Sequence, residues 1–210
     1  MKFTARLIGL VILTGLPLIS LAGKYNAIMN IGDPLPVFSH LPSTAGNTVS
    51  SDQIEEQVLV IVSLANHCPW VRGMDKDLAE LVSTFEDQSV RFIGLSVNHR
   101  EDDRLPAMKI HADKNGYQFD YLYDESQALG RKLGATRTPE YFVFNGERNL
   151  VYMGALYDSP AKMNHDGSVS HIDGEPAEFY VHDAIVSVLS GQEVEINETR
   201  AHGCTVKYVQ

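Results

Sequence analysis

Residues 58–70 have the sequence Val-Leu-Val-Ile-Val-Ser-Leu-Ala-Asn-His-Cys-Pro-Trp, and this stretch decides the fold class. The run from Val58 to Leu64 is apolar and rich in β-branched residues, which predicts a strand that helices bury on both faces. Pro69 suits the first turn of a helix, where its missing N–H costs no hydrogen bond. The sequence therefore predicts a strand, a turn that carries Cys68, and a helix.

Cys68 is the first candidate for chemistry. At a helix N-terminus, unpaired backbone N–H groups and the helix dipole stabilise a thiolate, so this cysteine is a candidate nucleophile. Only one other cysteine exists in the chain, Cys204 near the C-terminus. In an oxidising compartment, two cysteines can also form a purely structural disulfide, and that alternative stays open. The apolar residues that define the helix face after Cys68 are Val71, Met74, Leu78, Leu81, Val82 and Phe85.

The rest of the chain predicts an α/β domain. Residues 91–97 form a second buried strand, and two such strands around a helix make a right-handed βαβ unit with a parallel pair. Asn98 and His99 follow that strand and are expected near the same edge of the sheet as Cys68. Helices are expected over 103–115 and 126–133, with a short apolar link at 121–124 between them. A β-hairpin is expected from 141–144 and 150–153. A long surface loop over 157–175 and a last helix over 176–189 complete the domain.

The chain divides into three segments. Residues 1–22 have a short basic region followed by an apolar run and a small-x-small pattern, which predicts a cleaved signal peptide. Residues 23–191 form the α/β domain, and residues 192–210 form a C-terminal tail that carries Cys204. We therefore expect a periplasmic or extracellular protein that is not stably inserted in a membrane after cleavage.

Composition narrows the range of partners. The 210 residues have a formal net charge of −10, and a surface of that sign repels nucleic acid. His165, Asp166, His171 and Asp173 form a short cluster, but their spacing matches no defined metal site. The sequence predicts no metal ion and no cofactor.

Several short motifs together resemble the redoxin branch of the thioredoxin-like superfamily, which includes alkyl hydroperoxide reductases and thiol-specific antioxidant proteins. The resemblance covers residues 31–208. The motifs that carry it are Gly32-Asp33-Pro34, Asn66-His67-Cys68-Pro69, residues 121–127, Gly134-Ala135 with Thr138-Pro139, and residues 203–207.

The resemblance implies a thioredoxin-like fold, with a central mixed β-sheet flanked by helices. It also implies that Cys68 is the redox-active thiol and that Thr138-Pro139 is a cis-proline loop beside it, exposing a backbone edge where an extended substrate can pair. Asn66, His67, Pro69 and Trp70 surround the thiol in sequence, and His67 is a candidate to stabilise the thiolate or to act as a general acid.

Three positions depart from known patterns. Val71 stands where a dithiol reductase has its second cysteine, and Ala65 stands where a typical peroxiredoxin has a threonine. Arg137 replaces a cysteine that often precedes Thr-Pro, and supplies a cation that could lie near Cys68. With no local partner for Cys68, Cys204 becomes the candidate resolving thiol.

Two functions follow from the sequence. The first is an exported thiol oxidoreductase that uses Cys68 on a disulfide or a peroxide and is regenerated by a thiol reductant. The second is a non-catalytic thioredoxin-like binding module with a structural disulfide or a metal-carrier role.

Overall fold

The structure is a computed structural model that describes residues 23–210. The predicted signal peptide, residues 1–22, lies outside the described residues. The strands are β1 (Leu41–Pro42), β2 (Thr48–Val49), β3 (Val58–Leu64), β4 (Val90–Ser96), β5 (Asp120–Tyr123), β6 (Arg137–Thr138), β7 (Glu140–Phe144), β8 (Leu150–Gly154), β9 (Ala161–Met163), β10 (Val169–His171) and β11 (Cys204–Thr205). The α-helices are α1 (Pro69–Thr84), α2 (Leu105–Asn115), α3 (Ala128–Leu133) and α4 (Tyr180–Leu189).

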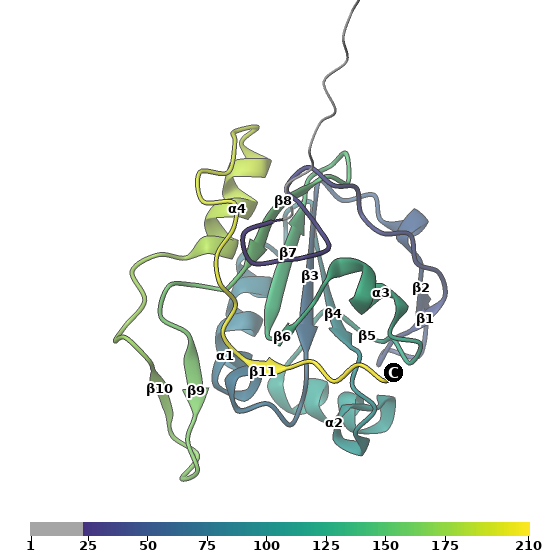
Figure 1. Cartoon of the computed structure of the whole chain (residues 1–210), viewed down its shortest axis with the longest axis vertical. Helices are drawn as coiled ribbons and strands as arrows, with labels where there is room; N and C mark the ends of the chain where they lie inside the picture. Colours follow the sequence, from purple (N-terminus) through teal and green to yellow (C-terminus); the bar gives the residue numbers. More distant parts are fainter. Residues whose placement is uncertain (1–22) are drawn as a thin grey trace, which may run out of the picture.

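A five-stranded mixed sheet in the order β5-β4-β3-β7-β8 forms the centre of the fold. β3, β4 and β5 run parallel, whereas β7 and β8 are antiparallel to their neighbours. All seven residues of β3 are buried, as its continuous apolar sequence predicts. The predicted thioredoxin-like fold, with a mixed sheet flanked by helices, is confirmed (Figure 1).

Each face of the sheet has its own apolar cluster. Side chains from α1, α2 and α4 cover one face, and Met74, Leu78 and Ile185 are among them. Side chains from α3, the segment around β1 and β2, and the C-terminal tail cover the other face, including Leu133 and Val206. Burial of both faces fixes the ends of the central strands, so the turn after β3 is held at a defined place.

The sequence-based interpretation was wrong in three segments. The expected link at 121–124 contains β5, which pairs with β4 in parallel register. The expected surface loop over 157–175 contains the β9–β10 hairpin, and Ala161 is fully buried. The last helix begins at Tyr180 rather than at residue 176. β5 pairs with β4 and β9 packs on α1, and both of these contacts are distant in sequence, so local pattern could not reveal them.

Other elements follow the sequence closely. The helix after Cys68 and the β7–β8 hairpin with its loop at 145–149 are present as predicted. α2 ends at Gly116 and α3 at Gly134, and both glycines adopt the left-handed conformation that ends helices.

Candidate active site

Cys68 is the N-cap residue of α1, at the carboxyl end of β3. Its side chain is fully buried. Its Sγ lies 3.0 Å from the backbone oxygen of Thr138. The Thr138-Pro139 peptide bond is cis. The expected proline loop is therefore cis and lies beside Cys68.

The C-terminal tail brings Cys204 to the same place. β11 pairs with β6 in antiparallel register, with Cys204 opposite Thr138 and Thr205 opposite Arg137 (Figure 1). The two sulfur atoms lie 2.6 Å apart, and both thiols are free. Residues separated by most of the domain in sequence are thus direct neighbours, as a resolving role for Cys204 requires.

Gly203 permits this close pairing. A β-carbon on Gly203 would lie 2.2 Å from the backbone oxygen of Thr138. Without a side chain at Gly203, the backbones of β11 and β6 can approach each other closely. Any larger residue at this position would push β11 away from β6.

Hydrogen bonds hold the rest of the tail against the domain. The buried Asn98 side chain accepts the backbone N–H of Lys207 at 2.9 Å, and Gln127 accepts that of Val209 at 2.8 Å. The Arg131 guanidinium donates to the backbone oxygen of Val209 and lies 4.5 Å from the centre of the Tyr208 ring. The tail is therefore a packed part of the domain.

The environment of Cys204 favours its protonated form. Burial, then the hydrogen bond with Cys68 and the charge of that sulfur, raise the pKa of the Cys204 thiol, and the nearby positive charge of Lys162 opposes the shift. The docked position of Cys204 therefore favours its neutral thiol at neutral pH.

His67 is fixed by a buried carboxyl group. Its Nδ1 lies 2.7 Å from Oδ2 of Asp103, whose side chain is fully buried. Asp103 ends a short 3-10 turn over Glu101–Asp103, just beyond β4. The contact fixes the imidazole ring of the residue that precedes Cys68.

The remaining predicted residues have separate roles. Asn66 links the turn to its surroundings, since its side chain donates to the backbone oxygen of Asp102 at 2.6 Å and accepts the Tyr121 hydroxyl at 3.0 Å. Trp70 is half-buried, and the Nζ atom of Lys162 lies 5.5 Å from its ring centre. Arg137 donates to the Thr205 hydroxyl at 2.7 Å, so this cation binds the tail.

Sequence reasoning missed two residues at this site. Asp103 was expected only as the start of a helix, and Lys162 lies in a segment that was expected to be a loop. A buried carboxyl partner for an imidazole leaves no signal in local sequence, because the two residues meet only through adjacent strand ends. The β9 strand that carries Lys162 is too short to give a periodic pattern.

Two further points concern metal binding and membrane-spanning helices. Within residues 23–210, no group of three or more His, Cys, Asp or Glu side chains could hold a metal ion. His171 instead contacts the backbone oxygen of Ser159 at 2.6 Å through Nδ1. No helix within this range is long and apolar enough to cross a membrane.

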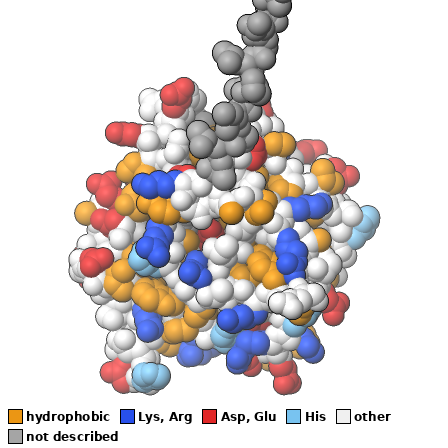
Figure 2. All heavy atoms as spheres, in the orientation of Figure 1, with side chains coloured by type: hydrophobic (Ala, Val, Ile, Leu, Met, Phe, Trp, Pro, Cys, Tyr) orange, Lys and Arg blue, Asp and Glu red, His pale blue; other side chains and the backbone are white. Residues whose placement is uncertain are grey.

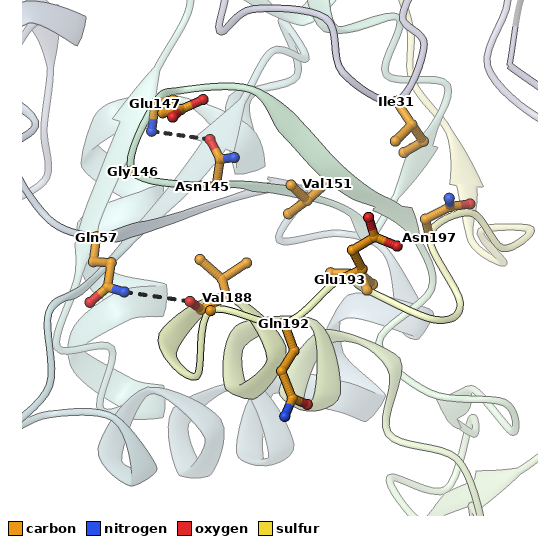
Figure 3. A pocket seen from close by; sticks show the side chains of 12 residues that line it. Ile31, Gln57, Asn145, Gly146, Glu147, Val151, Val188, Gln192, Glu193 and Asn197 are labelled. Carbon is orange, nitrogen blue, oxygen red and sulfur yellow. Dashed lines mark hydrogen bonds between the residues drawn. The ribbon is translucent and has the colours of Figure 1, made fainter.

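A separate pocket of about 550 Å³ lies far from the thiols, beside the β7–β8 loop and the end of α4 (Figure 3). Its rim includes Glu147 and Glu193, and Gln57 donates to the backbone oxygen of Val188 at 3.4 Å across one side. The pocket lies near the start of β3, whereas Cys68 follows the end of that strand. It contributes no group to the candidate active site.

Comparison with known protein families gives one decisive match. The family model described as Redoxin matches residues 30–168, which is more than half of the chain. This chain belongs to the Redoxin family. Family membership supports a thiol oxidoreductase function in general. The matched region of this redoxin contains Cys68 and the Thr138-Pro139 loop, but ends before Cys204. No curated protein sequence matched the chain.

Several solved structures share the fold of this chain. An uncharacterized conserved protein from Geobacillus kaustophilus is 27% identical with a TM-score of 0.77, covering 88% of this chain and 95% of its own. A hypothetical protein from Sinorhizobium meliloti 1021 is 25% identical with a TM-score of 0.74, covering 86% and 96%. A thiol:disulfide interchange protein of the thioredoxin family from Chlorobium tepidum is 22% identical with a TM-score of 0.51, covering 60% and 86%, which supports the fold alone.

Proposed function

We propose that this redoxin is an exported two-cysteine thiol oxidoreductase, with Cys68 as the nucleophile and Cys204 as the resolving thiol. The observation that carries the proposal is the 2.6 Å separation of the two sulfur atoms beside the proline loop. A strand pairing holds this arrangement, with Cys204 opposite Thr138. No cysteine adjacent to Cys68 in sequence is needed when the tail supplies one.

The reaction follows from thiol chemistry. The Cys68 thiolate attacks one sulfur of a disulfide and expels the other as a thiolate, or attacks one oxygen of a peroxide and expels the other as hydroxide or alkoxide, which forms a mixed disulfide or a sulfenic acid. Cys204 then attacks the Cys68 sulfur, forms the Cys68–Cys204 disulfide and releases a second thiol or water, which takes the Cys204 proton. The substrate gains two electrons and the two protein thiols lose them. A thiol reductant restores the dithiol state.

The neighbours of Cys68 suit this sequence of steps. His67 is oriented by Asp103 and lies next to the reacting thiol, so it is the candidate proton donor to the leaving group. Asn66 and Pro69 fix the turn and the helix start, and the Thr138 backbone oxygen lies at hydrogen-bond distance from the Cys68 sulfur.

Single-turnover kinetics test the reaction. The reduced protein is mixed with hydrogen peroxide, an organic peroxide or a small disulfide, and free thiols are counted with time. Wild type is expected to lose two thiols and to give a Cys68–Cys204 linkage in non-reducing peptide maps. Cys204→Ser is expected to stop at a mixed disulfide or sulfenic acid on Cys68, and Cys68→Ser is expected to be inactive.

The same experiment separates catalysis from a structural disulfide. The buried position of Cys68 against Cys204 also suits a fixed cystine that has no substrate. That alternative predicts a linkage that resists mild reduction and does not turn over with any oxidant. Repeated turnover with a thiol reductant would exclude it.

Export is a further part of the proposal, and it rests on the sequence of residues 1–22. The mature protein is expected to begin close to Gly23. N-terminal sequencing of the protein from a periplasmic or culture fraction tests this, and recovery of Met1 in a membrane fraction would contradict it.

A further inference from the structure

A pocket of about 390 Å³ lies between the start of α1, which follows Cys68, and the β9–β10 hairpin. His67 and Pro69, on either side of Cys68 in sequence, are among its lining residues. The lining side chains that are or can become positively charged are His67, Arg72, Lys162 and His165. No acidic side chain of the described residues lines this pocket.

The two permanent cations of the pocket have no acidic partner. Arg72 and Lys162 take part in none of the ion pairs within residues 23–210. Lys162 is close enough to the thiols for its charge to act on Cys204. Both cations are therefore available to a ligand that binds in this pocket.

The fold fixes Lys162 at this place. A β-carbon on Gly73 of α1 would lie 2.7 Å from the Cα atom of Lys162, so β9 rests directly on the helix backbone. The Lys162 side chain also packs over Trp70, one residue after Pro69. The position of the cation is thus set by packing between α1 and β9.

The charge of this pocket contrasts with the protein as a whole, which has a formal net charge of −10. Figure 2 shows Lys and Arg side chains over the central and lower part of the face that carries the C-terminal strand, while most acidic side chains lie at its rim. A local positive region attracts small anions, and the acidic remainder of the surface repels them.

The tail limits the size of a partner that can reach the thiols. An extended polypeptide would pair with the backbone edge at β6, but β11 occupies this edge through Cys204 and Thr205. The backbone N–H of Val206 donates to Thr136 at 3.0 Å and extends the pairing. Cys204 is half-exposed, so a small molecule can reach its sulfur while the tail is in place.

We infer that the pocket binds a small thiol with carboxylate groups, and that this thiol is the reductant of the Cys68–Cys204 disulfide. This inference rests on the proposed function, because it names the electron donor for the same pair of thiols.

The chemistry uses the two cysteines in a defined order. A thiolate of the reductant attacks Sγ of Cys204, the more exposed sulfur, and Cys68 leaves as a thiolate at the N-terminus of α1. A second reductant thiolate then attacks the mixed disulfide at the sulfur of the small molecule, and Cys204 leaves and takes up a proton. Two reductant molecules are oxidised to one disulfide, and the protein disulfide gains the two electrons.

The test compares thiols that differ in charge. The oxidised full-length protein is reduced with mercaptosuccinate, which has two carboxylates, with neutral 2-mercaptoethanol, or with the blocked peptide acetyl-Gly-Cys-Thr-Val-amide. Each rate is divided by the rate of the same thiol with hydroxyethyl disulfide, which removes differences in intrinsic reactivity. Wild type is expected to prefer mercaptosuccinate over both other thiols by about tenfold or more at low salt, and less at high salt.

Variants then assign the preference to the pocket. Arg72→Gln and Lys162→Gln are each expected to lower the preference several-fold, and the double variant is expected to bring it close to one. Lys76→Gln is the matched control, because Lys76 lies on the same helix, is exposed and does not line the pocket. Its preference is expected to equal that of wild type.

The outcomes separate this inference from the proposed function. If 2-mercaptoethanol or the peptide reduces the protein as well as mercaptosuccinate, or if the double variant keeps the wild-type preference, the pocket does not select the reductant. The thiol oxidoreductase function would survive that result. If no Cys68–Cys204 disulfide forms, or no thiol opens it, the proposed function itself fails.

Discussion

Cys204 lies opposite Thr138 in the β11–β6 pair, and the backbone oxygen of Thr138 also lies 3.0 Å from the sulfur of Cys68. One short stretch of backbone beside the proline loop therefore aligns both thiols. The strand pairing places Cys204 beside Cys68 although the two cysteines are far apart in sequence. In a dithiol reductase the second cysteine is instead a close neighbour of the first in sequence.

The first prediction concerns the close approach at Gly203. In Gly203→Ala, the new β-carbon would meet the Thr138 backbone oxygen, which cannot yield as a flexible side chain would. We expect β11 to move away and the equilibrium for disulfide formation between Cys68 and Cys204 to fall by about tenfold or more, since disulfide geometry is strict. Titration against a thiol–disulfide buffer measures this equilibrium.

Gly146→Ala is the control for that experiment. A β-carbon on Gly146 would lie 3.5 Å from the backbone oxygen of Gln57, an ordinary contact in a loop far from the thiols. Its disulfide equilibrium is expected to match wild type. Equal equilibria for all three proteins would show that the β11–β6 pairing does not control the thiols.

The second prediction concerns tail release. Arg131→Ala removes the hydrogen bond to Val209 and the contact with the Tyr208 ring. An exposed cation–π contact contributes about 0.5–1 kcal/mol and a hydrogen bond about 1 kcal/mol, so alkylation of Cys68 should become roughly tenfold faster. The measurement is the rate of iodoacetamide labelling of Cys68 in Cys204→Ser, with and without Arg131→Ala.

Lys132→Ala provides the comparison, because Lys132 is exposed on the same helix and donates to Val37 rather than to the tail. Labelling is expected to stay at the starting rate. A rate for Arg131→Ala no higher than that of the control would mean that access to Cys68 does not depend on this anchor.

The third prediction concerns the His67–Asp103 contact. His67→Ala leaves the fully buried Asp103 side chain without its imidazole partner, and a buried charged group without a partner typically costs about 2–3 kcal/mol. Urea denaturation measures the free energy of unfolding. Asp103→Asn in the His67→Ala background should recover part of the loss, because an amide is less costly to bury than a carboxylate.

His99→Ala serves as the control for stability. His99 also follows β4, but its ring contacts the backbone oxygen of Glu125 at an exposed site. Its effect is expected to stay within about 0.5 kcal/mol. A similarly small loss in His67→Ala would show that Asp103 does not need this partner.

The fourth prediction concerns pH. Burial and then the hydrogen bond with Cys68 raise the pKa of the Cys204 thiol from its ordinary value of 9.0 to about 12. The docked tail therefore favours the protonated Cys204 thiol. The stabilisation of the docked tail by this thiol is complete below pH 9.0 and is lost as the pH rises from 9.0 toward about 12. NMR spectra of the buried Val206 methyl groups between pH 8 and pH 11 should report progressive tail release.

Cys204→Ser removes the titrating thiol, so that variant should not show the same change in the Val206 methyl signals. The comparison also corrects for tyrosines that titrate in this range. An identical pH profile in wild type and variant would assign the change to another group and would contradict a protonated Cys204 in the docked tail.

The sequence by itself determined the centre of the fold and the place of the first thiol. The six apolar residues among the seven of β3, the proline after Cys68 and the hairpin of β7 and β8 are local signals, and each predicts one structure because backbone preference and burial pattern agree. Two glycines at helix ends added correct boundaries. These features need no knowledge of distant residues.

Tertiary structure alone decided how the other groups meet. β5 has four residues and β9 three, so each forms only because a neighbouring strand or helix offers hydrogen bonds and an apolar surface. Asp103 meets His67 because β3 and β4 end side by side, and Lys162 approaches the thiols because Gly73 lets β9 rest on α1. Cys204 reaches Cys68 because β11 pairs with β6, and this pairing closes a loop that spans most of the chain. The two strands can approach closely because Gly203 has no side chain.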